Sequence, residues 1–167
     1  MKKFESELVE QIPRLRRYAR ALTGSSHGAD DLVQDTLERA LQKQQLWHRG
    51  SRLRPWLFTI MHNLFINQVR RISSQPVTQD LDENIRDNGS SPESQWSFQH
   101  LQTSIATLPD EQKQVFLLVS LEGFAYEEVA KIMDIPVGTV MSRLSRARDR
   151  LRQLLSEQQQ TRLRRIK

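Results

Sequence analysis

Cysteine is absent from this sequence of 167 residues, which excludes disulfide bonds, thiolate zinc sites and cysteine nucleophiles. Long hydrophobic runs are absent as well. The longest uninterrupted apolar run, Val115 to Val119, is far shorter than the roughly 20 residues that span a bilayer. The amino-terminal residues also lack the apolar core of a signal peptide. We therefore predict a soluble, cytoplasmic protein without membrane insertion.

The usual signatures of an enzyme are missing too. The four histidines, His27, His48, His62 and His100, lack metal-ligand spacing, and we find neither a glycine-rich phosphate loop nor a nucleophile motif. We predict no catalytic residue, no metal site and no cofactor. An enzyme stays an alternative that steady turnover of a nucleotide or peptide substrate would support.

The sequence is rich in basic residues, but they are unevenly distributed. The net charge is +5, with an isoelectric point near 10.0. Residues 1–74 carry +6 and residues 139–167 carry +7, whereas residues 75–90 carry −3 and residues 91–138 carry −5. Two basic regions around an acidic middle favour two separate contacts with a polyanion. Ordinary solvated faces are the alternative interpretation.

The composition of the chain and a segment without apolar periodicity divide it into two parts. Hydrophobic residues make up 37% and aromatic residues 7%, which suits two small cores better than one thick core. Residues 75–90 have no sustained apolar period. We predict an all-α protein with two small helical domains, residues 1–74 and 91–160, joined by a flexible acidic linker at 75–90. A basic tail, 161–167, is expected to be disordered.

Apolar residues recur at helical steps through both parts. In the first part they predict helices over about 8–22, 30–41 and 55–71, with Pro13 marking a kink or a first helical turn. Ser25 and Ser26 are available as caps, and Asp30 and Asp31 are expected to begin the second helix. In the second part Pro92 is expected to open a helix, and further helices are predicted over about 115–121, 126–133 and 137–155.

The last two predicted helices have the spacing of a helix-turn-helix. Ala130 lies inside the first, Asp134 in the turn, Pro136 at the entry of the second, and Val140 where the inner face of the second begins. The outer face carries hydroxyl groups and then arginines, a pattern that suits the major groove of DNA. Its candidate contacts are Thr139, Ser142, Arg143 and Arg146. An amphipathic hairpin with a solvated arginine face is the alternative.

In the first part, aromatic side chains are interleaved with basic and amide side chains. Cations for phosphates, flat rings for stacking and amides for base edges are what single-stranded nucleic acid requires. The candidate contacts are Trp47, Arg49, Arg52, Arg54, Trp56, His62, Asn63, Asn67, Arg70 and Arg71. Trp56 and Phe65 also suit a protein core, and Asn63 also suits a satisfied hydrogen bond on a helix surface.

The predicted helix 30–41 is acidic rather than basic. Its outer side chains lie beside Leu32 and suit a basic groove on another protein: Asp31, Gln34, Asp35 and Glu38. Acidic residues near a helix start also stabilise its dipole and keep it soluble, which is the alternative explanation.

Taken together, these segments resemble the extracytoplasmic-function sigma factors, small sigma-70 relatives with regions 2 and 4 only. The resemblance runs in the family's order from about Leu8 to Leu155, and four segments carry it: Asp31-Leu32-Val33-Gln34-Asp35; Trp56-Leu57-Phe58-Thr59-Ile60 with Asn63; Leu108-Pro109; and Tyr126 to Leu151.

The resemblance implies a subunit of RNA polymerase that directs promoter recognition and DNA melting. Asp31, Leu32, Gln34 and Asp35 match the motif that binds core RNA polymerase. Asn63, the loop from Trp47 to Arg54 and the start of the following helix match the region that captures single-stranded minus-10 DNA. The helix from Val137 matches the reader of duplex minus-35 DNA. An anti-sigma factor is expected as a further partner, as it is for many relatives.

Two departures from the family pattern prevent a transfer of the promoter sequence. Met141 stands where many relatives carry lysine, and Asp134 stands where glycine is common, although Asp tolerates the left-handed conformation better than most residues. The rival DNA-binding function is a free-standing helix-turn-helix repressor or activator. That protein would need its own dimer interface, and the sequence has no long heptad seam to form one.

Overall fold

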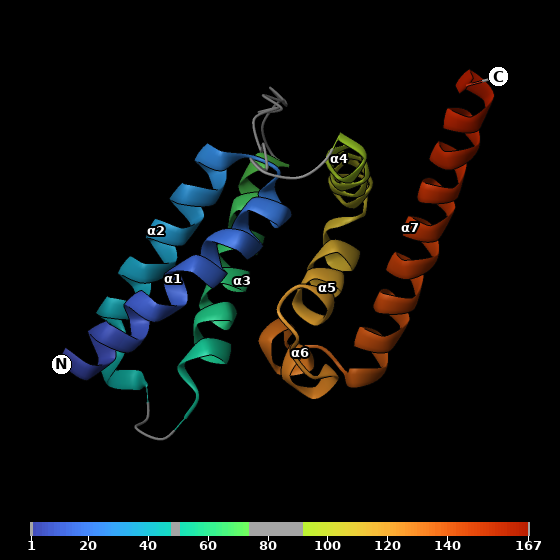
Figure 1. Cartoon of the computed structure of the whole chain (residues 1–167). Helices are drawn as coiled ribbons and strands as arrows, with labels where there is room; N and C mark the ends of the chain where they lie inside the picture. The colour runs from blue at the N-terminus through green and yellow to red at the C-terminus, as the bar shows by residue number, and fades with distance from the viewer. Residues whose placement is uncertain (1, 48–50, 74–91, 167) are drawn as a thin grey trace.

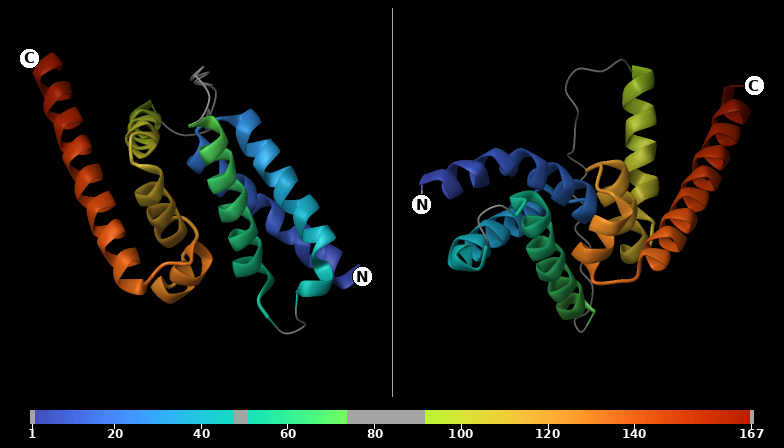
Figure 2. Two further views of the ribbon diagram at one scale, coloured as in Figure 1. Left: turned by 180° about the vertical axis from the view of Figure 1, so that it is seen from behind. Right: turned by 90° about the horizontal axis from the view of Figure 1, so that it is seen from below.

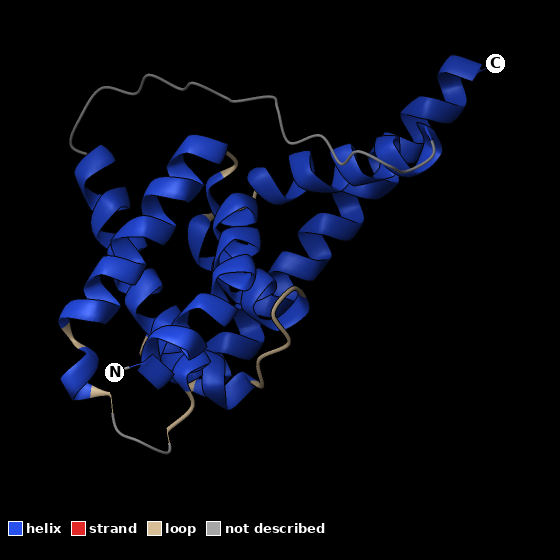
Figure 3. Ribbon diagram, turned by 60° about the vertical axis from the view of Figure 1, so that its left-hand side comes forward, coloured by secondary structure: helices blue, strands red, loops and turns tan. Residues whose placement is uncertain are grey.

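The computed structural model describes residues 2–47, 51–73 and 92–166. All regular structure within these ranges is helical, which confirms the predicted fold class (Figure 3). The predicted linker, residues 75–90, and the predicted DNA contact Arg49 lie outside the described residues.

The amino-terminal helices form one group (Figure 1). Their bounds are α1 Lys2–Thr23, α2 Ser26–Gln42, the short 3-10 helix η1 Gln44–Leu46, and α3 Leu53–Ile72. Leu15, Leu32 and Leu57, one from each long helix, have 0% exposure and mark the centre of this core. The spacing of apolar residues at helical steps therefore predicted which faces of these helices pack in the core.

One local feature of this group corrects the sequence prediction, and a second decides between two alternatives. Helix α2 begins at Ser26, four residues before Asp30, because the Ser25 hydroxyl oxygen accepts a hydrogen bond from the backbone N–H of Gly28 at 3.1 Å and caps the helix there. Pro13 lies in the middle of α1, so the alternative that it opens the helix is wrong.

The carboxy-terminal helices form the second group, drawn in yellow to red in Figure 1. Their bounds are α4 Pro92–Ala106, α5 Asp110–Ser120, α6 Tyr126–Met133 and α7 Val137–Ile166. Val115, Val129 and Val140 have 0% exposure and join α5, α6 and α7 in one core. Gly123, which has a φ of +70°, follows α5 and allows the sharp turn toward α6.

The turn between α6 and α7 is the tight connection of a helix-turn-helix. Asp134 adopts the left-handed conformation, with φ 53° and ψ 54°, which Asp tolerates better than most residues. The backbone N–H of Ile135 donates a 3.0 Å hydrogen bond to the carbonyl of Ala130 and closes the end of α6. Ala130 is 8% exposed, so its small side chain lies within the packed pair.

Helix α7 is longer than predicted. The expected disordered tail is wrong as far as Ile166, because the helix continues through Arg162, Arg164 and Arg165. The chain has no glycine or proline between Gly138 and Ile166, and the glutamines, leucines and arginines that fill this stretch are good helix formers. Only the carboxy-terminal end of α7 extends past the other helices (Figure 1).

The two groups of helices lie against each other in all views (Figures 1 and 2). Helix α3 packs on α6, and α1 packs on both α4 and α5. Phe58 of α3 meets Phe124 of the turn after α5 edge to face, with ring centres 5.1 Å apart. Within the described ranges, every helix is too short or too polar to cross a membrane.

Candidate nucleic-acid interface

The recognition helix of the helix-turn-helix separates an apolar face from a polar face. Val140, Leu144 and Ala147 are buried against the other carboxy-terminal helices. On the opposite side Ser142 and Arg146 are exposed, and Thr139 is half-buried at the helix start. The start of α7 therefore presents hydroxyl and guanidinium groups on one exposed face, and these are groups that can contact the major groove of DNA.

Arg143, the fourth predicted duplex contact, is placed differently. Its side chain is only 21% exposed, and its Nη2 lies 3.6 Å from Glu111 Oε2 of α5. It also raises the local positive potential around His62 of α3. Arg143 thus lies toward α5 and α3, at the edge of the outer face that Ser142 and Arg146 share.

One face of α3 carries the polar residues predicted to meet single-stranded DNA. Asn63, Asn67 and Arg70 follow one another at helical steps, and all three are exposed. Arg71 beside them is exposed as well. The structure therefore brings four of the predicted contacts together on the surface in the second half of α3.

The two predicted tryptophan contacts lie in a different environment. Trp47 and Trp56 are half-buried, and both pack on Phe4 of α1, with ring centres 5.4 Å and 6.3 Å apart. Phe65 is 7% exposed. These rings contribute to the amino-terminal core, as the alternative interpretation of Trp56 and Phe65 predicted. Only the exposed parts of the two indole rings are accessible to a base.

Three further predicted contacts, at the start of α3 or within it, are held by residues of the carboxy-terminal group. Arg52 Nη1 is 3.1 Å from Glu128 Oε2 of α6. Arg54 pairs with the carboxylate of Glu122 at 3.3 Å, and His62 Nδ1 shares a hydrogen bond with Gln114 Oε1 of α5. Glu122 and Gln114 were not among the predicted contacts. The signals in the sequence are a carboxylate three residues after the apolar run of α5 and an amide directly before that run.

The surroundings of His62 favour its neutral form. Burial is the main cause that lowers the pKa of His62, and the positive charge of Arg143 lowers it further, while the hydrogen bond with Gln114 acts in the opposite direction. A neutral imidazole suits a contact between two packed groups of helices, because it adds no buried charge.

The acidic face of α2 is largely as predicted. Asp31, Gln34 and Asp35 are exposed, and Asp31 is paired with His27 at 3.4 Å. Leu32 is a correction: it is 0% exposed and belongs to the core, so its side chain is unavailable to a second protein. Leu32 instead anchors the helix that presents the other three residues. The described residues contain no cluster of histidine, aspartate and glutamate that could hold a metal ion.

Comparison with known proteins identifies both groups of helices. The family model described as the Sigma2 domain of PhyR matches residues 8–62, and the model for Sigma-70, region 4 matches residues 98–151. The ECF RNA polymerase sigma factor EcfG of Rhodopseudomonas palustris strain TIE-1 is 37% identical over 152 residues, which are 89% of this chain and 83% of that protein. SigE of Mycolicibacterium smegmatis is 33% identical, over 90% of this chain and 61% of that longer protein.

Solved structures agree with this assignment. The sigma factor RpoE of Bartonella quintana, solved with the anti-sigma factor NepR, superposes with a TM-score of 0.80 at 35% identity, covering 93% of this chain and 98% of that chain. CnrH, solved with the cytosolic domain of CnrY, superposes with a TM-score of 0.69 at 22% identity and supports the fold alone. The chain belongs to the ECF RNA polymerase sigma factors, the alternative sigma factors that direct transcription initiation.

Proposed function

We propose a division of labour between the two groups of helices. Residues 1–74 act as region 2, which binds core RNA polymerase and captures the minus-10 element as single-stranded DNA. Residues 91–160 act as region 4, which reads the minus-35 element as a duplex, and residues 75–90 connect them. The observation that carries this proposal is the separation of two polar faces: Ser142 and Arg146 on α7, and Asn63 and Asn67 on α3.

The acidic face of α2 is proposed to contact core RNA polymerase. Asp31, Gln34 and Asp35 are exposed on one helix whose other side is fixed in the core by Leu32. Exposed carboxylates on a rigid helix suit a basic groove in a second protein, and the charge pattern also speeds association.

Two further features of the proposal concern partners and location. RpoE of Bartonella quintana was solved with an anti-sigma factor, and we propose that a protein of this kind also restrains the present chain. The protein is proposed to work in the cytoplasm, where the DNA is, and to lack a catalytic activity of its own. Its contribution is binding energy shared among polymerase, duplex DNA and single-stranded DNA.

Run-off transcription with purified core polymerase on genomic fragments tests this function. The chain should yield discrete transcripts that core polymerase alone does not make. Absence of such transcripts across the genome would refute the proposal.

Two variants locate the DNA contacts within the same assay. Arg146→Ala should weaken protection of minus-35 DNA in footprints, whereas Arg152→Ala, which removes the same charge from an exposed site on α7, should leave it unchanged. Asn63→Ala should reduce permanganate reactivity of the melted strand more than it reduces closed-complex binding. Equal footprints for both arginine variants would contradict the assignment of Arg146.

A further inference from the structure

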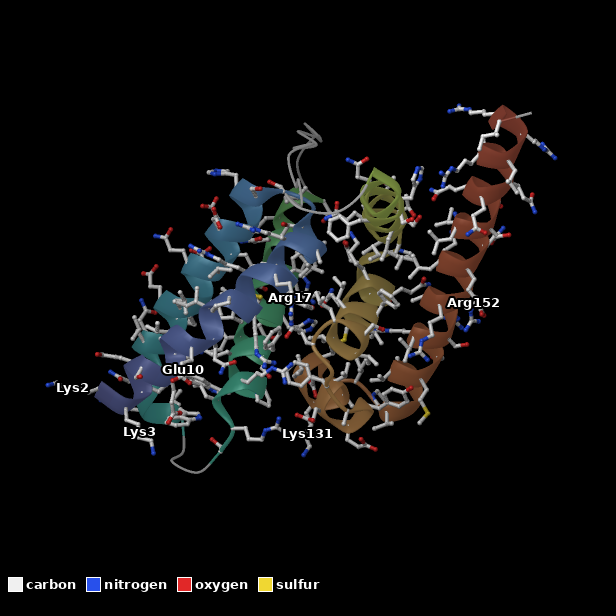
Figure 4. The ribbon with its side chains drawn as sticks, in the orientation of Figure 1. Lys2, Lys3, Glu10, Arg17, Lys131 and Arg152 are labelled. Atoms are coloured by element: carbon white, nitrogen blue, oxygen red, sulfur yellow. The ribbon has the colours of Figure 1, made fainter. Side chains whose placement is uncertain are left out.

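The carboxylate of Glu122 lies between two arginines that come from different amino-terminal helices. Its Oε1 is 3.1 Å from Nη2 of Arg17 in α1, and its Oε2 is 3.3 Å from Nη2 of Arg54 in α3. The side chain of Glu122 is 0% exposed, that of Arg54 is 17% exposed and that of Arg17 is 52% exposed. Figure 4 shows Arg17 where α1 faces the carboxy-terminal helices. The two guanidinium groups therefore form an anion site that is reached from the Arg17 side.

Arg54 is held in place by more than its ion pair. Its guanidinium also donates to the backbone carbonyl of Glu122 and lies 4.1 Å from the centre of the Phe124 ring. A guanidinium stacked on an aromatic ring keeps a fixed direction for its N–H groups. These two contacts come from the carboxy-terminal group and hold Arg54 while the groups are packed together, whereas the Phe58 ring of α3 itself, 5.9 Å away, stays beside Arg54 when they separate.

Neighbouring contacts involve the same face of α3. Arg52, the N-cap residue of α3, pairs with Glu128 at 3.1 Å, and His62 of α3 bonds to Gln114. Arg52, Arg54 and His62 are all among the predicted contacts of minus-10 DNA. Asn63 and Asn67 lie on a different face of α3 and are exposed.

A carboxylate and a phosphate are chemically interchangeable at such a site. Arginine donates paired N–H groups to either anion, and its guanidinium group stays protonated across the pH range in which proteins fold. A buried ion pair also gains little net stability, because desolvation of the charges offsets their attraction. Replacement of Glu122 by a DNA phosphate therefore exchanges one strong contact for another.

We propose that Arg17 and Arg54 form a binding site for a backbone phosphate of promoter DNA, and that Glu122 occupies this site in the free chain. The carboxy-terminal helices thereby mask part of the minus-10 surface, and the two groups of helices must separate before that phosphate binds. This inference rests on the proposed function of α3 and adds a phosphate site and its internal competitor.

Binding of a single-stranded oligonucleotide to the full chain without polymerase tests the masking. Glu122→Gln keeps the shape of the side chain but removes its charge, so fluorescence anisotropy should show about tenfold tighter binding than for the wild type. Adding Arg54→Gln should abolish the gain. Glu127→Gln is the matched control, because Glu127 is exposed on α6 and its change adds the same charge without touching the site.

Separation of the two groups is measured independently by energy transfer between dyes. Because the chain has no cysteine, dyes attach only at cysteines introduced at Gln42 in α2 and Gln159 in α7, both exposed. Glu122→Gln should lower the transfer efficiency, and saturating oligonucleotide should lower it in the wild type. If Glu122→Gln does not fold, Glu128→Gln opens the same interface while its amide keeps the cap of α6.

The possible outcomes separate this inference from the proposed function. The phosphate site is overturned if Glu122→Gln binds the oligonucleotide no more tightly than Glu127→Gln does. It is also overturned if the tighter binding of Glu122→Gln persists when Arg54→Gln is added. Unchanged energy transfer in all opening variants overturns the masking. Run-off transcription by the same wild-type preparation tests the sigma function alone, and its failure would refute that function whatever the oligonucleotide results.

Discussion

His62 couples the stability of the chain to pH. Its imidazole is half-buried between α3 and α5, bonds to Gln114 and lies near the positive charge of Arg143. These surroundings hold the pKa of His62 below its ordinary value in the folded chain, chiefly through burial. Protonation is therefore more favourable in the unfolded chain, where the imidazole is hydrated.

We expect acid to weaken the fold through this residue. Well above the ordinary histidine pKa of about 6.5, His62 is neutral in both states and contributes no pH dependence. As the pH falls below that value, the unfolded chain takes up the proton first and the free energy of unfolding decreases. Urea unfolding measures the decrease in the free energy of unfolding between pH 7.5 and pH 5.5. This decrease should be smaller for His62→Gln than for the wild type. Equal losses would mean that other groups carry the effect.

Asp134 allows a second prediction at this scale. Its φ of 53° places it in the left-handed region, which glycine adopts freely and a β-branched residue resists. Asp134 is exposed, so its replacement changes few packing contacts. Asp134→Val should lower the free energy of unfolding by about 1–2 kcal/mol, whereas Asp134→Gly should not lower it. A stable valine variant in urea unfolding would contradict the importance of this conformation.

Single residues also show what sequence reasoning reaches and what it misses. The buried stripe of α7, Val140 to Leu151, and the left-handed turn at Asp134 follow from local rules and were predictable. The partnership of Arg54 with Glu122 joins residues 68 positions apart, so no local pattern contains it. A half-buried tryptophan and a base-stacking tryptophan likewise have the same sequence signature.

At the scale of the helical element, α7 has two different halves. Its first half is fixed by buried residues such as Leu144, which is 2% exposed, while its second half includes Leu163, which is 64% exposed. Intrinsic helix propensity alone sustains few isolated helices, so the first half supplies most of the stability through packing.

The contrast predicts unequal effects of the same substitution. Leu144→Ala removes a buried side chain from the carboxy-terminal core and should lower the free energy of unfolding by about 2–5 kcal/mol. Leu163→Ala alters an exposed position and should change it by less than about 0.5 kcal/mol. Urea unfolding followed by circular dichroism measures both. A large effect of Leu163→Ala would show that the second half packs against something essential.

Element boundaries were less predictable than the elements themselves. Helix α2 starts at Ser26 because a serine side chain caps it, and the acidic pair that follows was an equally good start signal in the sequence. Helix α7 continues to Ile166 because nothing in its sequence breaks it, although charge and polarity there resemble a disordered tail. At each of these helix ends, two local sequence signals predict different boundaries. A single capping contact sets the start of α2, and the absence of glycine and proline lets α7 continue.

At the scale of the whole molecule, different faces of the chain are proposed to meet different partners. The acidic face of α2 is separate from the basic contacts of α3 and α7, and Asp31 is exposed on it. A charge reversal there should therefore disturb protein binding without disturbing the fold or the DNA-binding surfaces.

Asp31→Arg should abolish co-purification with core RNA polymerase. Asp30→Arg makes the same charge change at an exposed residue about 100° away around the helix and should retain binding. Circular dichroism of both variants should match the wild type. Normal binding by Asp31→Arg would remove the acidic face from the proposed polymerase contact.

The continuous α7 also connects the two ends of the carboxy-terminal group. A helix of 30 residues is about 45 Å long, and α7 packs on α5, α6 and α4. His100 of α4 lines a pocket together with Leu154 and Gln158 from the second half of α7. Because one helix makes all these contacts, a rotation of its first turns also moves the surface on which α4 packs.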